Sequence, residues 1–145
     1  MRGGFNSSFI EIKTLEGDKF IKDLRIGELI LTSTGYERLK NVFKRVAKVN
    51  DEVYNIYCHS DREIVLDRIS GEQVVYVYNP KEAYLVKTKV EDLQPGMMLW
   101  DKDEKGVIID NIEQMETINR FFYNVYVGDN TSYYVENIKI ESSKI

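Results

Sequence analysis

Two short stretches of this sequence share one pattern, and together they decide the fold. Residues 120–135 read RFFYNVYVGDNTSYYV, and residues 52–57 read EVYNIY. Both contain Tyr-Asn, an aliphatic residue and a second Tyr, and Tyr54 and Tyr123 lie 69 residues apart. Their bulky residues follow a period close to two, which is typical of β-strands covered on both faces.

The same offset of 69 residues recurs in a second pair of stretches. DLRIGELIL at residues 23–31 matches DLQPGMMLW at residues 92–100, and this match pairs Gly27 with Gly96. Both glycines are expected to supply the backbone geometry of a tight turn. Separate stretches that keep one register indicate two structurally similar halves.

A chain of 145 residues is expected to form one domain, residues 1–145, with a sizeable core. The first half is predicted at about residues 9–71 and the second at about residues 88–140. If a pseudo-two-fold axis relates the halves, the first strand lies near the last. The two ends of such a domain meet, which allows it to be inserted into a host protein.

One segment, ERLKNVFKRVAKV at residues 37–49, admits two interpretations. Leu39, Val42, Phe43 and Val46 fit the spacing of a helix. The equivalent stretch of the second half, VIIDNIEQM, is β-branched at its start, and its neighbours resemble strands. We therefore predict a strand here and a mostly β fold overall.

Composition argues against several classes of function. The net charge is −4 with both signs interspersed, so no nucleic-acid partner is expected, although Lys40, Lys44, Arg45 and Lys48 could form a local basic patch. One Cys and one His provide neither an internal disulfide nor a zinc site, and no metal or cofactor is expected. The sequence contains no long apolar run and no signal-peptide pattern. We expect an intracellular protein without membrane contact.

Four stretches resemble, in order, the motifs of Hint domains, the superfamily of inteins, bacterial intein-like domains and hedgehog-type autoprocessing domains. They are TLEGDKFIKDLRIGELILTSTGY (14–36), VYNIY followed by REIVLDR (53–68), VEDLQPGMMLW (90–100) and FYNVYVGDNTSYYVENIKI (122–140). The resemblance implies a flat horseshoe of antiparallel strands with two pseudo-two-fold related halves, in agreement with the repeat. It leaves no room between the halves for a homing endonuclease.

The resemblance also implies where splicing chemistry would lie. Family members begin with a Cys or Ser whose side chain attacks the preceding carbonyl, and this position falls at Ser7 or Ser8. The alternative is that both serines belong to an ordinary polar loop. The amide-polarising Thr and His of the second motif fall on Asp67 and Ser70. Arg68 is either a donor to an oxyanion or a surface charge.

At the carboxyl end, family members carry His-Asn followed by a nucleophile. Here Glu141 replaces the His, Ser142 replaces the cyclising Asn, and Ser143 takes the place of the downstream nucleophile. Serine has no side-chain amide from which a succinimide can form, so cleavage at the carboxyl end by asparagine cyclisation is not expected. Asn137 is expected inside a strand and is not expected to cyclise.

Cys58 and His59 are adjacent and could suggest a nucleophile with its base. Neighbouring residues of an extended strand point to opposite faces, so the two side chains are not expected to bond. A small buried hydrophobe beside a turn histidine is the preferred interpretation.

These observations predict a degenerate intein-like domain that is not an enzyme and is kept as a structural or interaction insert in a larger protein. Its partners would be the flanking host segments and a protein. One alternative is an active autoprocessing domain that uses Ser7 or Ser8 for splicing or for amino-terminal cleavage. A second alternative is an unrelated β binding module.

Overall fold

The computed structural model describes residues 3–144, and within them strands dominate. The elements are β1 (Glu11–Thr14), β2 (Gly17–Phe20), η1 (Ile21–Asp23), β3 (Leu29–Thr32), β4 (Gly35–Arg38), β5 (Asn41–Val46), β6 (Val53–His59), β7 (Glu63–Ser70), β8 (Val74–Asn79), β9 (Tyr84–Lys89), η2 (Val90–Asp92), β10 (Met98–Trp100), β11 (Gly106–Met115), β12 (Phe121–Tyr126), β13 (Ser132–Val135) and β14 (Ile138–Glu141). The predicted mostly β class is confirmed. No helix in this part of the chain has the length and apolar character needed to cross a membrane.

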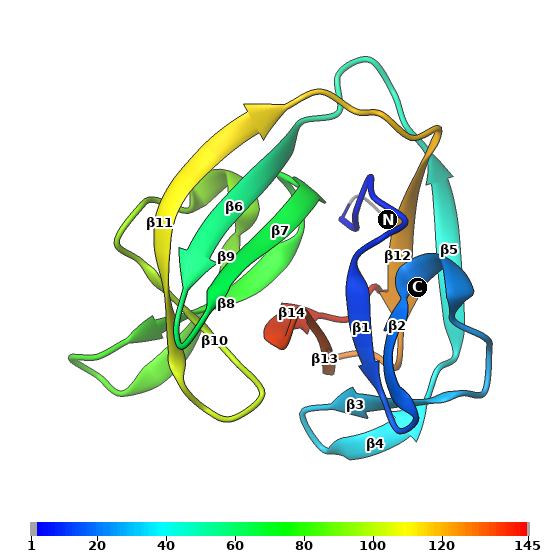
Figure 1. Cartoon of the computed structure of the whole chain (residues 1–145), viewed down its shortest axis with the longest axis horizontal. Coiled ribbons are helices and arrows are strands. Elements are labelled where there is room, and N and C mark those ends of the chain that lie inside the picture. Colours follow the sequence, from blue (N-terminus) through cyan, green and yellow to red (C-terminus); the bar gives the residue numbers. More distant parts are fainter. Residues whose placement is uncertain (1–2, 145) are drawn as a thin grey trace.

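Antiparallel pairing joins twelve of these strands into one bent sheet in the order β2-β1-β3-β13-β14-β8-β10-β11-β6-β7, with β4 beside β3 and β9 beside β8. The strands β5 and β12 form a separate two-stranded ribbon. In Figure 1, β6 to β11 make one lobe, β1 to β5 with β12 make the other, and β13 and β14 lie between them. The hairpin β13–β14 therefore connects the two lobes.

Alternating burial explains why β1 and β3 form strands. In β1 the buried side chains are Ile12 and Thr14, and in β3 they are Ile30 and Thr32. Intervening residues are only partly buried, as expected for a sheet with one face on the core. The β13 strand differs, because all four of its residues are buried. Its position between the lobes accounts for this difference.

The 69-residue repeat is visible in the backbone. The short helices η1 and η2 begin 69 residues apart, and each is followed by a glycine with nearly the same dihedral, φ 89° at Gly27 and 91° at Gly96. Arg68 and Asn137 share the offset and are both left-handed, with φ 46° and 65°. These two pairs of equivalent positions thus keep similar backbone conformations in both halves.

The two halves exchange strands. The β5 strand from the first half pairs with β12, and β11 from the second half pairs with β6. The strand prediction for the ambiguous segment is confirmed, because it forms the end of β4 and all of β5. The helical alternative is wrong: Leu39 is buried and exchanges backbone hydrogen bonds with Gly27 and Glu28, which interrupts the strand without forming a helix.

Candidate functional site

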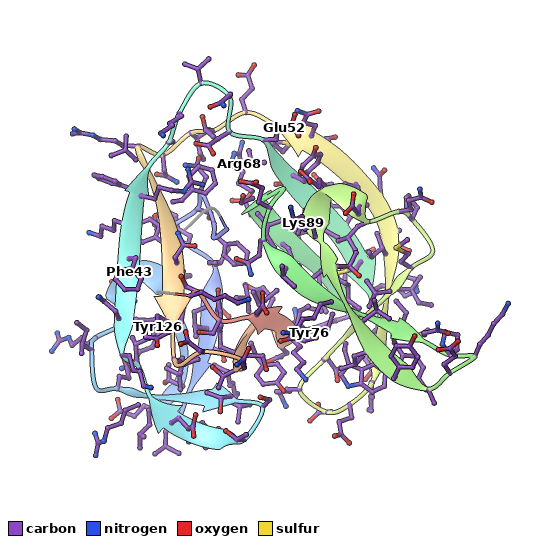
Figure 2. All side chains as sticks on the ribbon, turned by 180° about the vertical axis from the view of Figure 1, so that it is seen from behind. Phe43, Glu52, Arg68, Tyr76, Lys89 and Tyr126 are labelled. Atoms are coloured by element: carbon purple, nitrogen blue, oxygen red, sulfur yellow. The ribbon has the colours of Figure 1, made fainter. Side chains whose placement is uncertain are left out.

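The amino-terminal segment is inserted between strands of the two lobes. Phe5 is fully buried, and it exchanges two backbone hydrogen bonds of 3.0 and 2.8 Å with Tyr123 of β12. On the other side, the Ser70 amide at the end of β7 donates to the Gly4 carbonyl at 2.9 Å. A buried backbone needs such partners, and here both neighbouring strands supply them. Figure 2 shows Arg68 of β7 near this junction of the lobes.

Gly4 occupies a position that only glycine fits. Its φ is +97°, and a Cβ there would lie 2.5 Å from the Tyr123 carbonyl oxygen and 2.8 Å from the Asn124 side chain. Both the backbone conformation and the available space exclude a side chain. No side-chain nucleophile can therefore be carried at this point of the chain without rearrangement.

The carboxyl-terminal segment is held by the β12–β13 connection and by the end of β12. The Ser142 amide donates to the Thr131 carbonyl at 2.9 Å, and its Oγ accepts from the Val127 amide at 2.9 Å. The next amide, of Ser143, donates to the Val125 carbonyl at 2.8 Å. The predicted terminal position thus lies in a defined, buried conformation.

One side chain joins the two segments. The Gln73 Oε1 accepts from the Gly4 amide at 2.7 Å, and its Nε2 donates to the Glu141 carbonyl at 3.0 Å. Sequence reasoning missed this glutamine, which lies between β7 and β8 and carries no motif. The two ends of the domain meet through it.

Ser7 and Ser8 lie three and four residues beyond the glycine that meets the carboxyl-terminal segment. Both serines are buried, at 4% and 9% exposure, yet the structure records no hydrogen bond from either hydroxyl to another described residue. The polar group fixed in this region is instead Asn6, whose side chain accepts from the Ile118 and Asn119 amides at 2.8 and 3.0 Å. A nucleophilic role for either serine stays a prediction.

The second-motif residues are engaged elsewhere. The Ser70 Oγ accepts from the Glu72 amide at 3.2 Å, as in a local turn. The Arg68 guanidinium donates to Asp67 at 2.9 Å and to the Glu116 carbonyl at 3.0 Å. Asp67, which the sequence resemblance aligns with the Thr of the second motif, has its carboxylate in this ion pair. These contacts favour a structural role for Arg68.

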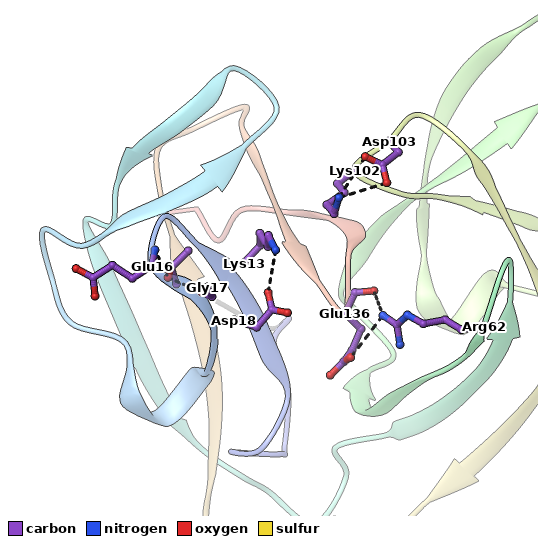
Figure 3. A network of polar contacts seen from close by, with 9 residues as sticks. Lys13, Glu16, Gly17, Asp18, Arg62, Lys102, Asp103 and Glu136 are labelled. Carbon is purple, nitrogen blue, oxygen red and sulfur yellow. Dashed lines mark hydrogen bonds and ion pairs between the residues drawn. The ribbon is translucent and has the colours of Figure 1, made fainter.

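Asn137 lies in the turn between β13 and β14 and not in a strand, which corrects the expectation from sequence. It follows Glu136, and the two left-handed residues, φ 49° and 65°, form a two-residue hairpin turn. Figure 3 shows Arg62 of the other lobe reaching Glu136, whose carbonyl accepts from it at 3.3 Å. The Glu136 carboxylate also accepts from the Glu11 amide at 3.2 Å, so this turn is tied to both lobes.

Cys58 and His59 point to opposite faces of β6, as predicted. Cys58 is buried, its Sγ lies 3.6 Å from the Ile64 carbonyl, and burial with the nearby Asp110 raises the pKa of its thiol to about 12. His59 is exposed and bonds the Asp110 carboxylate at 2.8 Å. A thiol protonated at neutral pH is a poor nucleophile, so the two residues are no catalytic pair.

Asn124 is a second residue that sequence reasoning missed as part of the site. Its side chain is 3% exposed and contacts the Gly4 position, and its Nδ2 has no hydrogen-bond partner among residues 3–144. The repeat equivalent, Asn55, accepts from the Arg68 amide at 2.8 Å. The repeated Tyr-Asn pattern was the available signal, because a polar residue recurs inside two buried strands.

Comparison with solved structures identifies proteins of similar architecture. The chain is similar to the gp41-1 intein, at 24% identity and a TM-score of 0.71, over 97% of this chain and 98% of that one. It is also similar to the bacterial intein-like domain from Clostridium thermocellum, at 16% identity and a TM-score of 0.76, over 99% of both chains. A DnaB intein from Synechocystis matches at 15% identity and a TM-score of 0.74, over 98% of this chain and 99% of that one.

A scan against protein-family models gives no match, and a search of curated proteins gives none either. The structural likeness nevertheless extends over nearly the whole length of each chain compared. It agrees with the strand exchange and with the meeting of the two ends. The chain thus has the fold of intein and bacterial intein-like domains, the Hint fold.

Proposed function

We propose that this chain is a degenerate intein-like domain without protein-splicing activity, kept as a structural or interaction insert in a larger protein. One observation carries the proposal. The point where the two ends meet is formed by Gly4, Gln73, Glu141 and the backbone of Ser70, with Ser142 as the next residue. These residues offer no thiol, imidazole or terminal asparagine.

The first step of splicing lacks its nucleophile at this point. An acyl shift needs a side-chain oxygen or sulfur next to the scissile carbonyl. Gly4 has no side chain, and the Tyr123 carbonyl occupies the space in which a Cβ would lie. A serine further along the segment would have to reach the reacting carbonyl by another route.

The later steps lack their groups as well. Ser142 has no side-chain amide with which to cyclise, and its Oγ accepts from the Val127 amide and donates to the Ser143 carbonyl at 3.2 Å. Ser70 has no imidazole to polarise the upstream amide, and removing one such donor typically costs about 10²–10³ in rate. The missing groups belong to different steps, so restoring one of them would not restore the whole reaction.

What supports a role as an insert is the closeness of the two ends. Domains whose ends lie together can be accommodated in a surface loop of a host without separating the flanking segments. Here one side chain bonds both segments, and strands of both lobes hold them on either side. The partners implied are the flanking host segments, together with any protein that contacts the domain.

The test places residues 1–145 between two carrier proteins and measures intact mass after overnight incubation. Parallel samples contain a strong thiol or hydroxylamine, which cleave thioesters and esters. We expect a single mass, that of the full fusion, in every sample. The gp41-1 intein between the same carriers is the positive control. Release of a carrier, lost on Ser7→Ala or Ser8→Ala, would replace this proposal with an active autoprocessing domain.

A further inference from the structure

The Gln73 side chain is buried and uses its hydrogen-bonding groups on three partners. It is 7% exposed; Oε1 accepts from the Gly4 amide, and Nε2 donates to the Glu141 and Val74 carbonyls, each at 3.0 Å. Its backbone is fixed too, because its amide donates to the Ser70 carbonyl at 3.0 Å. The side chain therefore leaves a rigid turn in a defined direction.

A carboxamide is the group that this position requires. The Gly4 amide is a donor and needs an acceptor, whereas the Glu141 carbonyl is an acceptor and needs a donor. A glutamine side chain presents one carbonyl oxygen and one NH₂ group, so it satisfies both partners at once. An ionised glutamate would offer acceptors alone, and an aliphatic side chain would offer neither. Buried groups left without partners are costly.

The glycine before Gly4 also fits this arrangement. A Cβ at Gly3 would lie 2.6 Å from the Gln73 Oε1, closer than real contacts allow. Side chains at Gly3 and Gly4 are thus disfavoured for two separate steric reasons. One at Gly3 would contact Gln73, and one at Gly4 would contact β12. The amino-terminal segment can approach the glutamine closely because neither residue carries a side chain.

We infer that Gln73 is a positioning residue that latches the two ends of the domain to each other. This inference rests on the proposed role as an insert and deepens it, because it names the contact that keeps the ends together. The latch acts only at the junction of the two ends, where the Gly4 and Glu141 segments meet. Its loss frees the Gly4 and Glu141 segments while the strands of the distant lobe, such as β6 and β11, keep their pairing.

Amide hydrogen exchange followed by NMR reads this directly, residue by residue. In the Gln73→Met variant, which keeps the side-chain length, we expect the Gly4 and Ser142 amides to exchange at least about tenfold faster. The Ile56 and Ile109 amides in β6 and β11 should change by much less. Gln114→Met is the matched control, since Gln114 is exposed on β11, and it should leave the junction amides unchanged.

A second variant keeps the test decisive if Gln73→Met fails to fold. In Gln73→Glu, the protonated carboxyl has both a donor and an acceptor, so it can rebuild the latch at acid pH. Burial raises the pKa of such a carboxyl above its usual value near 4.3. Charged residues near this position include Glu72 and Glu91, whose amide donates to the Gly71 carbonyl, and Glu141, whose carboxylate lies 2.9 Å from the Lys87 Nζ and 4.0 Å from the Lys144 Nζ.

We therefore expect protection of the Gly4 amide in Gln73→Glu to fall as pH rises, once rates are corrected for intrinsic exchange. The Gln73 carboxamide of the wild type does not titrate, so protection of the Gly4 amide in the wild type should show no such fall. A merely space-filling glutamine would give no acid rescue. Unchanged junction exchange in Gln73→Met, or an equal change at every amide, would overturn the latch.

The consequence for a host is tested by inserting the chain into a surface loop of a monomeric fluorescent protein. The Gln73→Met insert should lower the thermal midpoint of the host's fluorescence more than the Gln114→Met insert does. Equal midpoints would contradict the latch. This outcome is independent of the splicing assay, because an active domain could be latched and a silent one could lack the latch.

Discussion

Replacing Gly4 by alanine tests the packing of the junction with one methyl group. The new Cβ would lie 2.5 Å from the Tyr123 carbonyl oxygen and 2.8 Å from Asn124. The neighbours are backbone and a buried side chain, so they have little freedom to move. The backbone must also keep a φ of +97°, which L residues rarely adopt.

A matched glycine separates these two effects. Gly27 has φ +89°, yet nothing lies within 4 Å of a Cβ placed there. Gly27→Ala should therefore cost only the left-handed conformation, about 1–2 kcal/mol of unfolding free energy. Gly4→Ala adds the forced contact, about 1–3 kcal/mol more for overpacking. The effect of alanine on the unfolded chain is common to both variants and cancels.

Urea unfolding of the two variants and the wild type measures the difference. We expect Gly4→Ala to be the less stable variant, by about 1–3 kcal/mol at unchanged m-value. Equal losses, or a larger loss in Gly27→Ala, would refute the steric account of the junction. A residue with a nucleophilic side chain could then fit at this position as well.

Three further outcomes follow from the charges and burial. Burial would raise the pKa of Asp51, but the Lys48 amide and the Arg45 guanidinium, both donating to its carboxylate, hold the pKa below its usual value. Asp51→Asn should lower the free energy of unfolding by about 1–2 kcal/mol at pH 7. The stabilisation by Asp51 is present above about pH 4 and is lost as the pH falls through the folded pKa. The urea midpoints of the wild type and the variant should therefore converge in acid. Cys58 should resist a thiol reagent at pH 8 in native protein and react in urea. Burial raises the pKa of Glu136, because the ionised carboxyl is disfavoured in the folded state. Glu136→Gln should therefore stabilise the fold by up to about 1 kcal/mol at pH values above the folded pKa. Urea titrations below about pH 4 should show no such gain.

Several features could be predicted from the sequence because their signals are local or periodic. The alternation around Tyr54 and Tyr123 predicts strands, and both residues lie in strands, β6 and β12. Gly27 and Gly96 were identified as turn residues by their shared offset, and both adopt a positive φ. Strand geometry predicts opposite faces for Cys58 and His59, and the apolar character of cysteine predicts the buried face for Cys58. Each conclusion depends on a residue and its immediate neighbours.

The composition of the junction was decided by the tertiary structure. Counting along the chain places the nucleophile at Ser7 or Ser8, whereas the structure brings Gly4 against β7 and β12. Gln73 cannot be told from the exposed Gln114 by its sequence neighbours. Its partners are 69 residues before it and 68 after it, and hydrogen bonds at such separations exist only once the two lobes close on the hairpin β13–β14. Periodicity specifies which face of a strand is buried, but it carries no information about which distant backbone group will lie opposite a given side chain.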